Sequence, residues 1–260
     1  MTTHTMRINW VGMRTLYVRE SWRFLKVWNQ TVIAPMITTL LFLAILTLAL
    51  GREGRMIDDL PYAVFVAPGL IMMAVVQNAF ANTSSSLMLS KIQGVIIDIL
   101  MPPLSAAEVT FAMVAGGVTR GLMVGVSVSI AMWAFVPLEV HSWPLAFAFV
   151  VLASVMLALF GMLAGVFAIT FDHVAALTNY LITPLSFLSG TFYSIKALPG
   201  FWYTISHYNP FFYMIDGFRY AVTGYSDSDP YTGLAVLSVT SVILWAVVQT
   251  LYARGWRLKN

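Results

Sequence analysis

Apolar runs of about 20 residues recur along this chain, and they constrain its fold more than any motif does. A helix rises about 1.5 Å per residue, so such a run crosses the ~30 Å hydrocarbon core of a bilayer. Hydropathy and helix breakers predict six spans, at residues 31–50, 62–82, 107–135, 144–170, 174–192 and 231–252. Only 10% of the residues are charged and 59% are hydrophobic, whereas about 25% charged is usual in soluble domains. We therefore expect an all-α, multi-pass membrane protein folded as a single transmembrane domain, residues 1–260.

Lysine and arginine are distributed unevenly between the two sides of these spans. One side carries Arg7, Arg14, Arg19, Arg23, Lys26, Lys91, Arg254, Arg257 and Lys259. The other side carries Arg52, Arg55, Lys196 and Arg219, while Arg120 falls inside the third span. Because basic flanks resist translocation, this asymmetry predicts that both termini lie in the cytoplasm, which an even number of spans allows.

The segment before the first span, residues 1–30, is predicted to contain a helix that lies on the membrane surface. At about 100° per residue, one face collects apolar side chains and the opposite face collects cations: Trp10, Met13, Tyr17, Phe24 and Trp28 against Arg19, Arg23 and Lys26. Such a helix buries its apolar stripe at the headgroup boundary. A basic flank that only fixes the topology is the other interpretation, and the two are compatible.

The sequence lacks the motifs of several common catalytic and binding sites. The chain has no cysteine, and none of its four lysines stands in a Gly-Lys-Ser/Thr sequence, so it cannot build a Walker A loop. Its histidines are scattered, no His-Glu-x-x-His or Gly-x-Ser-x-Gly motif occurs, and a formal net charge of +3 gives no argument for nucleic acid. We expect neither a metal site nor an enzyme; a hydrolase using His207 remains an alternative. If ATP is consumed, another polypeptide binds it.

Ionisable residues inside the predicted spans are scarce, which weakens the alternative of an ion-coupled secondary transporter without excluding it. Arg120 is the exception, and it costs about 3 kcal/mol at the bilayer centre on insertion scales. It either binds an anionic substrate headgroup, or hydrogen-bonds to neighbouring carbonyls, or snorkels to the cytoplasmic interface. Glycines near it on one helix face, and a pair in the fourth span, predict close helix packing: Gly117, Gly121, Gly125, Gly161 and Gly165.

Residues 84–103 lie on the side assigned to the cytoplasm and contain an apolar stretch ended by Pro102–Pro103. The pattern predicts a short amphipathic helix that carries Lys91 and Asp98. Its apolar side chains suit docking against a partner protein, or contact with the lipid surface.

Residues 193–225, on the opposite side, are rich in aromatic residues. Pro199–Gly200 breaks the chain, Asn209–Pro210 is typical of a helix start, and Gly224 marks a helix end. This predicts two short helices that dip into the outer leaflet and return; an aromatic-rich loop on the headgroups is the alternative. Asp216 and Arg219, three residues apart, are spaced to pair.

Together these segments resemble a known family, the membrane subunits of ABC-2-type transporters, and within it the YadH-type permeases. The resemblance covers nearly the whole chain. It is carried by PGLIMM (68–73), NAFANTSSS (78–86), GGVTRGLMVG (116–125) and HSW (141–143). Its most specific parts are SGTFYSIKALPGFW (189–202) and HYNPFFYMIDGFRY (207–220).

The resemblance implies one six-helix half of an ATP-binding cassette exporter of the type V fold, in the inner membrane of a bacterium. Two permeases, expected as a homodimer, would join two ATPase subunits that bind ATP and Mg, and membrane lipids are the remaining partners. A coupling helix would contact the ATPase through Lys91, Gln93, Asp98 and Met101. The second and fifth spans would flank the substrate path, near Asn78, Asn82, Phe187 and Phe192. Family substrates are mostly amphiphiles, among them lipid-linked glycans, lipo-oligosaccharides and hydrophobic drugs.

Overall fold

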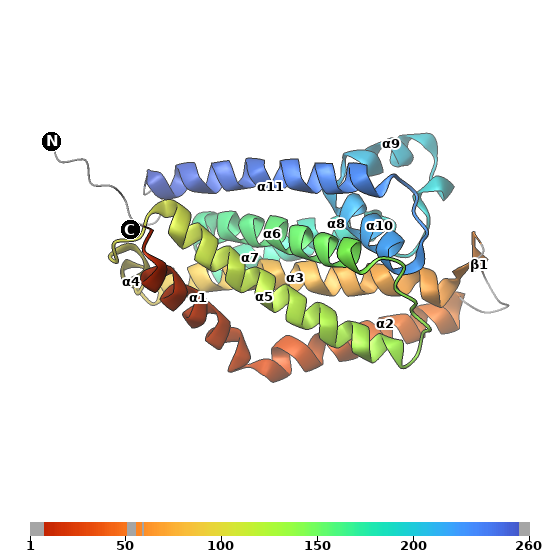
Figure 1. Ribbon diagram of the computed structural model, residues 1–260, viewed down its shortest axis with the longest axis horizontal. Coiled ribbons are helices and arrows are strands. Elements are labelled where there is room, and N and C mark those ends of the chain that lie inside the picture. Colours follow the sequence, from red (N-terminus) through yellow and green to blue (C-terminus); the bar gives the residue numbers. More distant parts are fainter. Residues whose placement is uncertain (1–7, 51–55, 59, 255–260) are drawn as a thin grey trace.

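The computed structural model describes residues 8–50, 56–58 and 60–254, and these form an elongated helical bundle (Figure 1). Arg7, Arg52, Arg55, Arg257 and Lys259, used above for orientation, lie outside the described residues. Within the described part, five helices are long and apolar enough to cross a membrane. They are Asn29–Ala49, Tyr62–Ile92, Ala106–Trp133, Trp143–Phe167 and Pro230–Ala253.

The fifth predicted span, 174–192, is helical but does not meet the same measure. It consists of α7 (Phe171–Leu177), a π-helical stretch η2 (Thr178–Ile182) and α8 (Thr183–Leu188). Asp172, His173 and Asn179 lower the hydropathy of this segment, and the helix ends at Leu188 rather than at 192. Within the described residues, the structure thus has five apolar spans and a sixth helical segment of similar length that is less apolar.

Helix α3 (Tyr62–Ile92) forms the centre of the bundle and is much longer than predicted. Most of it is buried, and it packs against α5 (Ala106–Trp133), α6 (Trp143–Phe167) and α10 (Pro210–Thr223). The prediction ended this span at residue 82 because a polar stretch begins there, with Asn82 and the serines at 84–86. Those side chains face neighbouring helices rather than solvent, so the helix continues for ten more residues.

Glycines allow this close packing, as predicted. A Cβ on Gly117 would lie 2.8 Å from Ala158 Cβ, and one on Gly121 would lie 2.5 Å from Ser154 Oγ. On α6, a Cβ on Gly161 would collide with Thr83 Oγ1 and the Phe80 carbonyl of α3. Backbones at these positions can approach only because hydrogen takes the place of a side chain.

The N-terminal helix α1 (Trp10–Leu25) is joined to α2 (Ala34–Leu50) by a π-helical stretch, η1 (Asn29–Ile33). Asn9 caps α1 by accepting a hydrogen bond from the Gly12 N–H. Helix α1 packs mainly on α5, whereas α2 lies along α3 with little of its surface buried. Pro35 is the second residue after η1, and the wider π turn accommodates a residue that has no N–H to donate.

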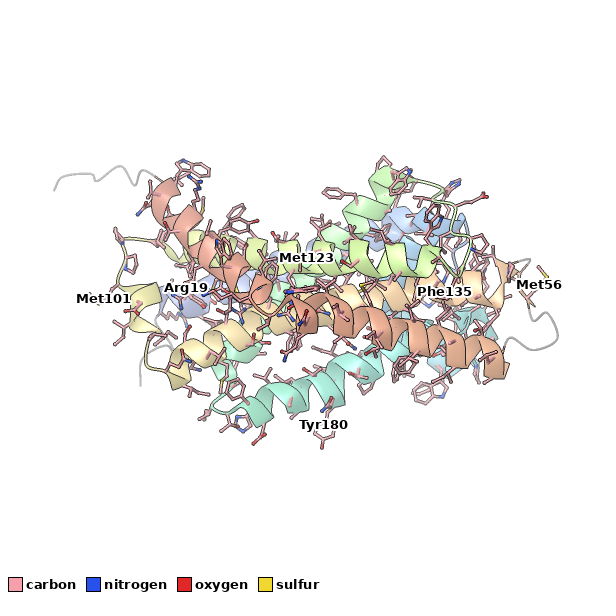
Figure 2. All side chains as sticks on the ribbon, turned by 90° about the horizontal axis from the view of Figure 1, so that it is seen from below. Arg19, Met56, Met101, Met123, Phe135 and Tyr180 are labelled. Carbon is pink, nitrogen blue, oxygen red and sulfur yellow. The ribbon has the colours of Figure 1, made fainter. Side chains whose placement is uncertain are left out.

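The two ends of the bundle differ in character (Figure 1). At one end lie the start of α1, the short α4 (Ile97–Leu100) and the end of α11 (Pro230–Ala253). At the other end lie α9 (Gly200–Tyr208), α10 and a small antiparallel pair, β1 (Met56–Ile57) with β2 (Leu60–Pro61). We call these the α4 end and the α9 end. Figure 2 marks them by Met101 and Met56, at opposite extremes of the molecule.

The two short helices expected within 193–225 are present. After the 3-10 turn η3 (Ile195–Ala197), α9 begins at Gly200, and α10 begins after Asn209, whose side chain accepts from the Phe211 N–H. Helix α10 ends at Gly224, whose φ of 77° is left-handed. Asp229 then caps α11 by accepting a hydrogen bond from the Thr232 N–H. This hydrogen bond lowers the pKa of the Asp229 carboxyl.

Candidate functional site

The connection between α3 and α5, residues 93–105, carries exposed apolar side chains at the α4 end, among them Ile97. Gly94, with φ of 71°, turns the chain sharply after α3, and four residues of α4 follow. The single amphipathic helix predicted around Lys91 and Asp98 is therefore wrong: Lys91 belongs to the last turn of α3, and Asp98 to α4. Gln93, Asp98 and Met101 are exposed, and Met101 is 77% exposed.

The Lys91 side chain binds backbone carbonyls of this same chain. Its ammonium donates to three carbonyls at the end of α6, those of Gly165 (3.1 Å), Val166 (2.7 Å) and Ala168 (3.0 Å). A cation at a helix C-terminus satisfies carbonyls that lack intrahelical partners and opposes the negative end of the helix dipole. Of the four predicted coupling residues, Lys91 thus positions the connection, and the other three remain available to a partner.

One carboxylate joins the starts of α1 and α5. Glu108 accepts from the backbone N–H of Asn9 (2.5 Å), and also from the N–H (2.7 Å) and hydroxyl (2.8 Å) of Ser105. Ser105 in turn caps α5, which completes a capping box. Farther along, Tyr17 and Thr119 share a 3.0 Å hydrogen bond. The α3–α5 connection is thereby fastened to α1 as well as to α5.

The middle of α1 contributes a buried polar cluster that the sequence interpretation missed. Glu20 is 1% exposed and accepts from Ser86 Oγ at 2.7 Å. Arg23 donates to Ser85 Oγ (2.9 Å) and to the Asn82 carbonyl (2.5 Å) and Oδ1 (3.0 Å), and lies 3.4 Å from Glu20.

This cluster corrects the predicted faces of α1. Arg23 was expected among the headgroups opposite the apolar stripe, but it turns inward, because α3 offers carbonyl and amide oxygens there. Of the apolar stripe expected at the headgroup boundary, Met13 and Phe24 are instead buried against the bundle, whereas Trp10 and Trp28 are 66% and 55% exposed and remain open to lipid. The glycine at 116 leaves room for the Glu20 side chain, because a Cβ there would lie 2.9 Å from Glu20 Cβ, but nothing in the sequence linked the two residues.

Arg120 is paired with Asn78. Its Nε and Nη2 donate to Asn78 Oδ1 at 3.2 and 3.0 Å. Of the three roles left open for Arg120, the structure favours hydrogen bonding to a neighbouring group. Asn78 holds its own orientation by donating to the Ala74 carbonyl at 3.0 Å.

The four residues expected along a substrate path fall into two separate groups. Asn78 and Asn82 face Arg120 and Arg23, and Asn82 is fully buried. Phe187 and Phe192 contact each other, with ring centroids 5.3 Å apart. No hydrogen bond or ring contact among the described residues links the two groups.

A second polar cluster lies at the α9 end. Asp216 and Arg219 are both fully buried, 3.6 Å apart, as their spacing predicted. Arg219 also donates to the carbonyls of Phe65 (3.1 Å) and Gly190 (2.5 Å), and its guanidinium lies 4.0 Å from the Phe65 ring centroid. Asp216 accepts from the N–H groups of Asp227 and Ser228, both at 2.9 Å.

Tyr225 extends this cluster to the β1–β2 turn. Its hydroxyl lies 2.7 Å from both Asp58 Oδ2 and Asp227 Oδ1. Nothing in the sequence indicated that Asp58 meets Tyr225, because 167 positions separate them. Among the described residues, no group of three or more His, Cys, Asp or Glu side chains is placed to hold a metal ion.

Taken with the apolar spans, this arrangement defines a polytopic helical membrane protein whose polar residues fasten helices to one another. A model of the ABC-2 type transporter family matches residues 12–223. The chain is 39% identical to the inner membrane transport permease YadH of Escherichia coli K12, over 98% of this chain and all of that protein. The chain therefore belongs to the ABC-2 type transporter family, as a multi-pass inner-membrane transport permease.

More distant similarity extends to proteins named for nodulation. Nodulation protein J of Sinorhizobium fredii is 20% identical over 92% of this chain and 94% of that protein. Nodulation protein J of Rhizobium meliloti is 21% identical over 83% of this chain and 82% of that protein.

Proposed function

We propose that this permease exports an amphiphilic or lipid-linked molecule, using ATP hydrolysed by a separate ATPase subunit. The observation that supports this most is the α3–α5 connection, which presents Ile97, Asp98 and Met101 outward while being fastened on its inner side. Lys91 holds it to α6, and Glu108 holds it to α1 and α5. A force applied to this connection is therefore delivered to four helices at once. ATP and Mg would be bound by the partner, in keeping with the absence of a Walker A sequence from this chain.

The proposed topology has six spans, with the segment Phe171–Leu188 as the fifth, and both ends on the cytoplasmic side. Lys91, at the end of α3, and Arg254, just after α11, lie at the α4 end, and Arg14 and Arg19 belong to α1, which starts at that end; these cations support placing the α4 end in the cytoplasm. Helices α9 and α10 would then dip into the outer leaflet from the far side. Exposed aromatic residues on α9 suit an interfacial position: Phe201, Trp202, Tyr203 and Tyr208.

Two copies of the permease would meet along α2 and the α7–α8 segment. Only 11% of the first span is buried, against 72% of α3, and its exposed side chains are apolar: Ile37, Leu41, Phe42, Ile45 and Leu48. Tyr180, 83% exposed, points away from the bundle (Figure 2). Closure of two ATPase subunits would push the two α3–α5 connections together, and the permeases would rock about this shared surface.

The experiment compares Met101→Glu with Met56→Glu after co-expression with a candidate ATPase. Both methionines are exposed, at opposite ends of the molecule. Met101→Glu should lose co-purification of the ATPase and ATP-dependent uptake of a fluorescent lipid into inverted vesicles, whereas Met56→Glu should retain both. Transport driven by a proton or sodium gradient without ATP would instead establish the secondary-transporter alternative.

A further inference from the structure

A recess opens on the side of the bundle between the α9-end halves of α5 and α6. Its volume is about 540 Å³, within the range of about 300–1,000 Å³ common for small-molecule sites. Its floor is formed by Ile71 of α3 and by Phe218 and Val222 of α10. This recess lies apart from the α3–α5 connection and from both polar clusters.

The lining of the recess is almost entirely hydrocarbon. Ser129 supplies a hydroxyl and the two tryptophans supply indole N–H groups; the other lining residues are apolar. At its mouth, Val126, Ile130 and Phe147 are 58%, 65% and 62% exposed. Because α5 and α6 are both apolar enough to cross a membrane, this mouth opens onto bilayer hydrocarbon and not onto water.

The length and position of the recess match one leaflet. Its lining on α5 runs from Leu122 to Trp133, a rise of about 16 Å at about 1.5 Å per residue. Half of a ~30 Å hydrocarbon core is nearly the same length. Trp133 and Trp143 close the end near the membrane surface, 70% and 73% exposed, where tryptophan marks the headgroup level. Figure 2 shows this stretch of α5 between Met123 and Phe135.

We propose that this recess binds one acyl chain of a phospholipid from the leaflet at the α9 end. A helix of a second copy is about 10 Å wide with its side chains and cannot enter the gap between two packed helices, whereas a single acyl chain can. The chain lies parallel to α5 and reaches Phe218 and Val222. Lipid thereby supports α10, the helix that carries the buried Asp216–Arg219 pair. Assigning this leaflet as the outer one rests on the proposed topology; the binding itself does not.

The test uses the purified permease in vesicles of phosphatidylethanolamine and phosphatidylglycerol, doped with a phosphatidylcholine that carries a photoreactive diazirine on its acyl chain. Labelled peptides are mapped by mass spectrometry. Labelling should concentrate on the α5, α6 and α10 residues that line the recess. Val126→Trp places an indole over the mouth and should reduce that labelling roughly threefold or more, since the occupied space no longer admits the chain.

Val239→Trp on α11 is the matched control, because Val239 is 59% exposed against 58% for Val126 and does not line the recess. It should leave the labelling unchanged. Equal labelling of all lipid-facing helices, or no effect of Val126→Trp in a variant that folds as the control does, would overturn the proposal. So would a disulfide between two copies of Val126→Cys in this cysteine-free chain, since a second copy would then cover the mouth. The labelling experiment needs no ATPase, so it tests lipid binding even if the transport proposal is wrong.

Discussion

Arg219 has no exposed surface, yet it is charged, and its neighbours account for this. Asp216 supplies the opposite charge, and the Phe65 and Gly190 carbonyls accept two of its N–H groups. Such a site is strongly destabilised when one charge is removed, because the other charge is left without its counter-ion. The pair therefore fastens α10 to the start of α3 and to the turn after α8.

We predict that Arg219→Met lowers the free energy of unfolding by about 3–5 kcal/mol, the usual cost of breaking a buried ion pair. Lys196→Met is the contrasting variant. Lys196 is 54% exposed in its 3.5 Å pair with Asp227, and loss of an exposed pair costs about 0–1 kcal/mol. Denaturant unfolding in detergent measures both variants; equal losses would show that burial does not determine the contribution.

Glu108→Ala should release the start of α1 from α5, because its carboxylate accepts from both Asn9 and Ser105. The expected result is a lower Tm and faster proteolysis near Asn9. Glu139→Ala, at an exposed position in the loop before α6, is the control and should change neither. Unaltered proteolysis in Glu108→Ala would mean that the packing of Met13 and Leu16 holds α1 without the hydrogen bonds.

For individual residues, the sequence predicted the Asp216–Arg219 pair, because the two residues are neighbours on one helix. Arg120 was identified as a residue needing a partner, but Asn78 was not identified as that partner. Arg23 and Lys91 were both assigned outward roles, and both turn inward to backbone carbonyls. The sequence pattern locates a cation and indicates which side of the membrane it occupies. The direction in which its side chain points depends on carbonyls of other helices, and the sequence does not show where those carbonyls lie.

Among the elements, α3 and α6 share the most extensive contact, and Gly161 lies within it. A side chain there would collide with Thr83 and with the Phe80 carbonyl. The hydrogen bond from Thr83 Oγ1 to the Ala158 carbonyl, 2.7 Å, lies at the same contact. Side-chain volume at residue 161 therefore separates the two helices rather than filling a void.

Gly161→Val should destabilise the permease by about 1–3 kcal/mol or more, the range for overpacking a dense interior. Gly200→Ala tests whether the effect is general to glycine, since a Cβ at Gly200 meets nothing within 4 Å. Thermal unfolding in detergent should show a lower Tm for Gly161→Val alone. A similar Tm for both variants would contradict the packing role.

The helices themselves were largely predictable, because apolar length and helix-start residues are local signals. The starts at Pro210 and the stop at Gly224 agree with the structure. Two boundaries were not predictable. Helix α3 continues past Asn82 because its polar residues are satisfied by α1, and the predicted coupling helix divides at Gly94 because a left-handed φ ends the helix there.

For the whole molecule, the proposed topology predicts which end meets the cytoplasm. The chain has no cysteine, so single cysteines report their own location. Met101→Cys should react with a membrane-impermeant maleimide only after the cells are permeabilised, whereas Met56→Cys should react in intact cells. Both side chains are well exposed, so the difference reports the side and not the burial. The reverse pattern would invert the topology.

The unbroken length of α3 has a mechanical consequence. Its 31 residues make a rod of about 46 Å at about 1.5 Å per residue, longer than the ~30 Å hydrocarbon layer it crosses. One end continues into the connection that Lys91 secures, and the other reaches Phe65, whose carbonyl binds Arg219. A tilt of about 10° would move one tip by about 8 Å relative to the other. Pro68, the proline inside this helix, lies only three residues from Phe65, so the proline-free stretch from Gly69 to Lys91 carries a displacement at one membrane face toward the opposite face.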